Sequence, residues 1–71
     1  MSATPLQLVV NGEPRSLSAG ATVDALVESL GLERRKIAVA VNRDIVPRAA
    51  FASQTLHPGD RVEILEAVGG G

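Results

Sequence analysis

One segment of the chain has the pattern of an amphipathic α-helix, and it is too short to be stable alone. Four apolar residues recur at the i, i+3, i+4 and i+7 spacing, which places their side chains on one stripe of a helix. These residues are Val23, Leu26, Val27 and Leu30. Thr22 is a favoured N-cap, and Gly31 supplies the left-handed residue that commonly ends a helix. Because a helix over 22–30 needs tertiary packing to persist in water, we expect it to lie on a sheet.

The segments on either side of this helix have the composition and turn residues of β-strands. Residues 6–10 and 13–17 are predicted to form a β-hairpin, because Asn11-Gly12 between them strongly favours a type I′ turn. Pro14 has no N–H to donate, so the second strand is expected at an edge of the sheet. Three further strands are expected after the helix, over 37–41, 45–46 and 61–66. Between the last two, a loop with a helical turn is expected to lay Phe51 over the core.

This order of elements predicts one α+β domain. A hairpin, a helix and later strands fit a mixed sheet of about four to five strands with one main helix packed on one face. The order and size match the β-grasp (ubiquitin-like) architecture, in which the last strand lies centrally beside the first. We therefore expect a single β-grasp domain over residues 1–71 with a flexible C-terminal tail over 67–71.

The composition argues against several classes of function. The net charge of −1 and the single aromatic residue give no support for nucleic-acid binding. The absence of cysteine excludes a disulfide, a thiolate metal site and a cysteine nucleophile. His57 is the lone histidine, with no second ligand nearby for a metal and no motif that would place it in a catalytic triad. Without a signal peptide or an apolar run of roughly 20 residues, a cytoplasmic protein with no membrane contact is expected.

Three consecutive glycines follow the last predicted strand almost directly. The segment Ala67-Val68-Gly69-Gly70-Gly71 has almost no side chain to bury. Fully extended, these five residues would span about 17 Å at roughly 3.3–3.6 Å per residue. One interpretation is a thin thread that enters a partner's active site, where the Gly71 carboxylate is used chemically. The other interpretation is a frayed terminus with no function.

The face of the sheet opposite the helix is predicted to carry a small apolar patch. Strand alternation places four apolar residues there, around the strand that leads to the glycines. They are Val9, Ala38, Ala40 and Leu65. Docking of a partner on this patch would direct the thread toward the partner's active site, so we expect an interaction surface. The alternative is ordinary scattered surface apolarity.

Six segments, spread along nearly the whole chain, carry a resemblance to a known family. They are Val10-Asn11-Gly12-Glu13, Gly20-Ala21-Thr22-Val23, Val39-Ala40-Val41-Asn42, Ile45-Val46-Pro47-Arg48, Leu56-His57-Pro58-Gly59-Asp60-Arg61-Val62-Glu63-Ile64 and Ala67-Val68-Gly69-Gly70-Gly71. In this order they resemble the ThiS family, the small sulfur carriers of thiamine thiazole synthesis. Phe51 departs from the tryptophan expected in many members.

The resemblance implies a co-substrate and not an enzyme, with no catalytic residue, metal or bound cofactor of its own. A ThiF-like adenylyltransferase would use ATP to activate the Gly71 carboxylate, and sulfur from a desulfurase or a similar donor would then form a thiocarboxylate. This group would deliver sulfur to thiazole synthase. The residues expected to thread into the partner are Val68, Gly69, Gly70 and Gly71.

Three alternatives remain open at this point. A small subunit of molybdopterin synthase would share the fold, the tail and the thiocarboxylate, although the segment Val46-Pro47-Arg48 fits it less well. A ubiquitin-like modifier would instead be conjugated to a lysine of another protein through Gly71. A plain β-grasp interaction domain would not use its glycines at all.

Overall fold

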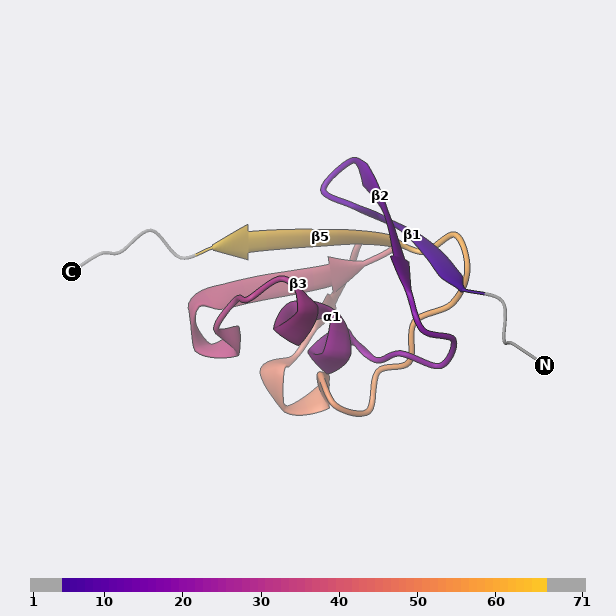
Figure 1. Ribbon diagram of the computed structural model, residues 1–71. Coiled ribbons are helices and arrows are strands. Elements are labelled where there is room, and N and C mark those ends of the chain that lie inside the picture. Colours follow the sequence, from indigo (N-terminus) through magenta and orange to yellow (C-terminus); the bar gives the residue numbers. More distant parts are fainter. Residues whose placement is uncertain (1–4, 67–71) are drawn as a thin grey trace.

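The computed structural model describes residues 5–66 as a sheet with one α-helix, α1, on one of its faces (Figure 1). The tail predicted over 67–71 lies outside the described residues. The strands are β1 Leu6–Val10, β2 Glu13–Leu17, β3 Ile37–Val41, β4 Asp44–Val46 and β5 Arg61–Glu66. The helix α1 spans Val23–Ser29, and two 3₁₀ turns, η1 and η2, span Arg34–Lys36 and Arg48–Ala50.

The sheet has five strands in the order β2-β1-β5-β3-β4. Its central pair, β1 and β5, runs parallel, and the other neighbours run antiparallel. The last strand therefore lies in the middle of the sheet, as predicted, with β1 on one side and β3 on the other. This mixed sheet with one covering helix is the β-grasp fold.

The first hairpin and its turn are confirmed. Asn11 and Gly12 have φ angles of +50° and +83°, and a type I′ turn requires a positive φ at both central residues. The turn sets the register, so that Val9 lies opposite Pro14. Since β2 is the first strand in the sheet order, the proline lies at an edge, where its missing N–H leaves no gap in the ladder.

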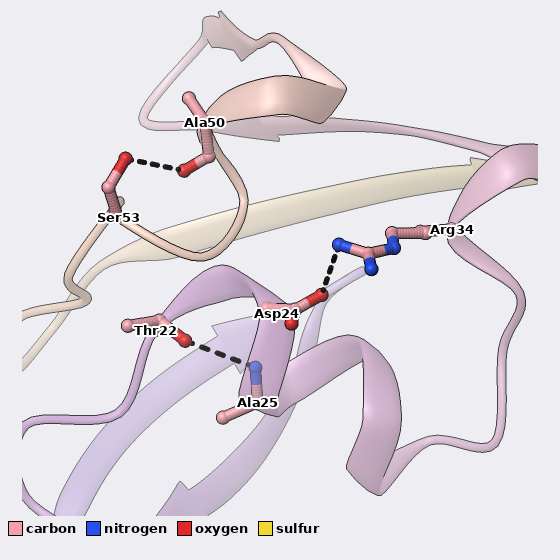
Figure 2. A network of polar contacts seen from close by, with 6 residues as sticks. All are labelled: Thr22, Asp24, Ala25, Arg34, Ala50 and Ser53. Carbon is pink, nitrogen blue, oxygen red and sulfur yellow. Dashed lines mark hydrogen bonds and ion pairs between the residues drawn. The ribbon is translucent and has the colours of Figure 1, made fainter.

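The helix α1 is capped at both ends by the residues that the sequence indicates. The Oγ1 atom of Thr22 accepts a hydrogen bond of 3.2 Å from the Ala25 N–H (Figure 2). At the other end Gly31 has a φ of +71°, and the chain reverses so that the Leu32 N–H donates to the Val27 carbonyl at 3.2 Å. This is the Schellman arrangement, and it satisfies a carbonyl that the helix leaves unpaired.

The loop after η2 closes the N-terminal end of the helix. The carbonyls of Phe51 and Gln54 accept hydrogen bonds from the Asp24 and Val23 N–H groups at 3.0 and 2.9 Å. Because the loop is fixed in this way, the Phe51 ring lies in the core, where the side chain is 1% exposed. An ion pair of 3.3 Å between Asp24 and Arg34 joins α1 to η1 on the surface (Figure 2).

The core lies between the helix and one face of the sheet and is entirely apolar among the described residues. Alternate positions of β1, β3 and β5 point into it, together with three of the four residues of the helical stripe; the fourth, Leu30, is partly buried against the core. The buried residues are Leu6, Leu8, Val10, Val23, Leu26, Val27, Ile37, Val39, Val41, Val46, Phe51, Leu56, Val62 and Ile64. The other face of the sheet is left without a covering layer within residues 5–66 (Figure 1).

The turn between β3 and β4 is tighter than predicted. Asn42 and Arg43 have φ angles of +51° and +74°, so a two-residue turn joins the strands and β4 begins at Asp44 rather than at Ile45. Asparagine tolerates the left-handed region better than most residues, whereas arginine does not favour it. This turn fixes the pairing of Ala40 with Ile45.

Candidate functional site

The strand β5 carries the chain toward the terminal glycines, so the contacts that hold β5 define the candidate site. On one side β3 pairs with it from Val62, opposite Val41, to its last residue Glu66, opposite Ile37. On the other side β1 pairs with only its first part, and Figure 1 shows β5 reaching past the β1–β2 hairpin. The predicted threading residues, Val68, Gly69, Gly70 and Gly71, lie outside the described part of the chain.

Asn11 extends the ladder between β1 and β5 after β1 has ended. Its own N–H donates to the Val62 carbonyl at 2.9 Å, which is the last backbone contact on this side of β5 in the described residues. Its side-chain amide then pairs with the next available backbone groups. The Asn11 Oδ1 accepts from the Ile64 N–H at 2.8 Å, and the Asn11 Nδ2 donates to the Ile64 carbonyl at 3.2 Å. An amide side chain thus occupies the place that another residue of β1 would have taken.

A second asparagine holds the beginning of β5. The Asn42 N–H donates to the Arg61 carbonyl at 2.7 Å, and the Asn42 Oδ1 accepts from the Arg61 N–H at 3.0 Å. The Asn42 Nδ2 donates to the Asp60 Oδ1 at 3.0 Å. The other carboxylate oxygen of Asp60 accepts from the His57 N–H at 2.8 Å, and this closes the Pro58-Gly59 turn that leads into β5.

The predicted apolar patch exists on the uncovered face, with one addition and one exception. Ala38 lies opposite Leu65, and Ala40 lies opposite Ile45 on the edge strand β4. Leu65 and Ile45 are each 73% exposed, and they are the two exposed large hydrophobic residues of the described chain. We call these four residues the outer patch. They line a hollow of about 330 Å³ together with Asn11, Val39, Arg43 and Glu63.

Val9, the fourth residue predicted for this patch, lies apart from the outer patch. It is half-buried on the uncovered face and lies opposite Arg61. The outward positions of β5 are Arg61, Glu63 and Leu65, so two charged residues separate Val9 from Leu65. Alternation alone predicted the correct face for Val9, but the parallel register of β1 and β5 decides its neighbours.

Sequence reasoning missed Ile45 as a patch residue and both asparagines as supports of β5. Ile45 is the neighbour of Ala40 because a two-residue turn precedes it, and the sequence does not indicate this turn because it requires a positive φ at Arg43. For Asn11 and Asn42, no sequence signal distinguishes an asparagine that supports β5 from one that only forms a turn, because each also has a positive φ in a turn. Their contacts span 53 and 19 positions of the sequence, respectively.

The described residues offer no metal centre. Within residues 5–66, no group of three His, Cys, Asp or Glu side chains lies close enough to hold an ion. His57 is exposed, and its Nδ1 lies 3.9 Å from the Asp60 Oδ2. In the same part of the chain, no helix has the length and apolar character that crossing a membrane requires. The described part of the candidate site therefore consists of the strand β5 and the outer patch, and it supplies no cluster of side chains for metal-assisted catalysis.

Comparison with known proteins matches this arrangement to one family. The sequence model of the ThiS family matches residues 8–71, which include the glycine end. The sulfur carrier protein ThiS of Escherichia coli is 32% identical over 66 residues, which cover 93% of this chain and the whole of that protein. A crystal structure of the thiamine biosynthesis protein ThiS from Geobacter metallireducens is 32% identical, with a TM-score of 0.79 and coverage of 93% of this chain and 100% of that one.

Two longer relatives carry a different name. A thiazole synthase of Paramagnetospirillum magneticum is 46% identical over 66 residues, and a thiazole synthase of Magnetococcus marinus is 33% identical over the same length. The matched region covers 93% of this chain but only 20% of each of those proteins. The chain therefore spans about a fifth of the length of these two relatives.

Proposed function

This chain belongs to the ThiS family, and we propose that it carries sulfur as a thiocarboxylate on Gly71 for thiazole formation. Membership of the family shows the general role, which is that of a sulfur carrier in thiamine biosynthesis. The thiocarboxylate proposal is supported by the family match, which extends through residue 71 and so includes the three glycines that follow β5 in the sequence.

The proposed chemistry has two steps, both carried out by partners. A carboxylate is a poor electrophile, so an adenylyltransferase first joins the Gly71 carboxylate to the α-phosphate of ATP and releases pyrophosphate. Sulfide, as HS⁻, then attacks the acyl carbon. The carbon–sulfur bond forms, the bond to AMP breaks, AMP leaves with its electron pair, and a proton is released. The product is a thiocarboxylate whose ionised sulfur is a strong nucleophile.

The chain itself contributes a folded domain that partners can bind and a glycine segment that can enter their active sites. The glycines at 69–71 lack side chains, so a narrow tunnel in a partner can accept them. The sequence contains no cysteine, so no side-chain thiol of the carrier competes for the sulfur. On this proposal the chain is a co-substrate, and the groups that bind ATP and catalyse both steps belong to the adenylyltransferase.

We assign the outer patch to thiazole synthase as its docking partner. In the two relatives called thiazole synthase, a region like this chain forms part of a longer protein of that name. The outer patch lies on β3, β4 and β5, and Leu65 is one residue from the end of the strand that leads to Gly71. A protein seated on this patch would therefore be close to the start of the thread. The exposed Leu65 and Ile45 side chains supply the apolar surface for such a contact.

The test of the first step is pyrophosphate release with ATP, a ThiF-like adenylyltransferase and the full chain. A variant that lacks Gly70 and Gly71 should release none, because its C-terminal carboxylate, now on Gly69, would lie two residues short of the position that the adenylyltransferase uses. The core residues all lie between Leu6 and Ile64, so the variant should melt like the full chain. Pyrophosphate release by the truncated variant at the rate of the full chain would refute the proposal. Recovery of the chain in isopeptide linkage to cellular proteins would instead identify a modifier.

A further inference from the structure

We infer that Asn11 is a positioning residue for the carrier reaction, because its side chain holds β5 at the point where β1 stops supporting it. The inference rests on the proposed function and concerns how the thread is presented. The evidence is one pair of hydrogen bonds, in which the Asn11 side-chain amide contacts the backbone N–H and carbonyl of Ile64, 53 positions further along the sequence.

The two sides of β5 differ in how far they are supported. The β3 side is paired through Glu66, whereas the β1 ladder reaches only Val62. Beyond it, the Asn11 amide satisfies both backbone groups of Ile64 on that side. Without this side chain, all of β5 beyond Val62 would have backbone contacts on one side only, in the described part of the chain. Strand ends held on one side fray more readily than those held on both.

Order in this part of β5 has a direct consequence for binding. A partner that threads the tail must find the preceding strand in a defined direction or must order it at the moment of binding. Rigidifying a segment in its bound conformation improves affinity by reducing the ordering cost. Once the thread is bound, the partner holds the reacting carboxylate, so the chemical step no longer depends on Asn11. The expected signature is a higher KM for the carrier with an unchanged kcat.

The chain offers a closely matched control in Asn42. Both asparagines have a φ near +50° at the first position of a two-residue turn, and both pair their side chains with the β5 backbone. Glycine adopts this φ without strain, so Asn11→Gly and Asn42→Gly each keep the turn and remove only the side-chain contacts. Asn42 acts at Arg61, at the end of β5 that is remote from the glycines. Both variants should lose stability, but only Asn11→Gly should alter the exit of the strand.

The test measures adenylation kinetics of the full-length variants, together with amide hydrogen exchange. Asn11→Gly should raise the KM for the adenylyltransferase about tenfold, a factor equivalent to about 1.4 kcal/mol, with kcat unchanged and faster exchange at the Ile64 amide. Asn42→Gly should keep the wild-type KM. Asn11→Asp keeps an acceptor for the Ile64 N–H but loses the donor to its carbonyl, so its KM should lie between those of wild type and Asn11→Gly.

Equal KM values for Asn11→Gly and Asn42→Gly would overturn the inference while leaving the proposed function intact. A raised KM without faster exchange at Ile64 would also overturn it, because Asn11 would then contact the partner directly. Failure of the wild-type chain to be adenylated would instead refute the proposed function on which the inference rests.

Discussion

Truncation of Leu65 tests whether the outer patch is an interaction surface. The side chain is 73% exposed, so Leu65→Ala should change the free energy of unfolding by less than about 0.5 kcal/mol. Full burial of a leucine side chain contributes about 1.5–3 kcal/mol, and most of that area is still available for a partner. Since alanine retains part of this contact, the complex should lose about 1–2 kcal/mol, and its Kd should rise about tenfold.

The assay is titration calorimetry of the variant against thiazole synthase, with urea unfolding as the check on stability. Glu28→Ala is a suitable control, because Glu28 is exposed on the helix that covers the other face of the sheet. Its Kd should equal that of the wild-type chain. An unchanged Kd for Leu65→Ala, with binding of the wild-type chain intact, would refute the assignment of the outer patch to this partner.

Three further predictions concern the stability of the fold and are checked by chemical denaturation. Phe51→Ala should lower the free energy of unfolding by about 3–5 kcal/mol, because it leaves a cavity in the packed core. A loss below about 1 kcal/mol would contradict the burial of the ring. Gly31→Ala should lower the free energy of unfolding by about 1–2 kcal/mol, because alanine is strained at a φ of +71°. A Cβ at this position would meet no neighbouring atom within 4 Å, so backbone strain is the whole of the expected loss. Thr22→Ala should cost about 1 kcal/mol and Thr22→Ser much less, because serine keeps the capping oxygen; equal losses would argue against the cap.

Local sequence signals predicted most of the fold because each depends on a few neighbouring residues. The hairpin turn at Asn11-Gly12, the cap at Thr22 and the stop at Gly31 all require specific side chains or φ angles, and the structure confirms each of them. The central place of β5 could also be predicted, because the order of elements matches one known architecture.

The remaining features depend on pairing between distant segments. Ile45 joins the outer patch because Arg43 accepts a φ of +74°, a conformation that arginine does not favour and that the sequence therefore does not indicate. Val9 lies apart from the patch because the β1–β5 register places it opposite Arg61. The support of Ile64 by Asn11 joins residues 53 positions apart, so no local pattern could predict it.

The intact mass of the full chain tests the central claim most directly. The chain would be incubated with ATP, the adenylyltransferase and sulfide, and its mass compared before and after. The account predicts a gain equal to the exchange of one oxygen for one sulfur, located on Gly71 by fragmentation and absent when ATP is omitted. An unchanged mass, under conditions in which the same enzyme converts the ThiS protein of Escherichia coli, would contradict it.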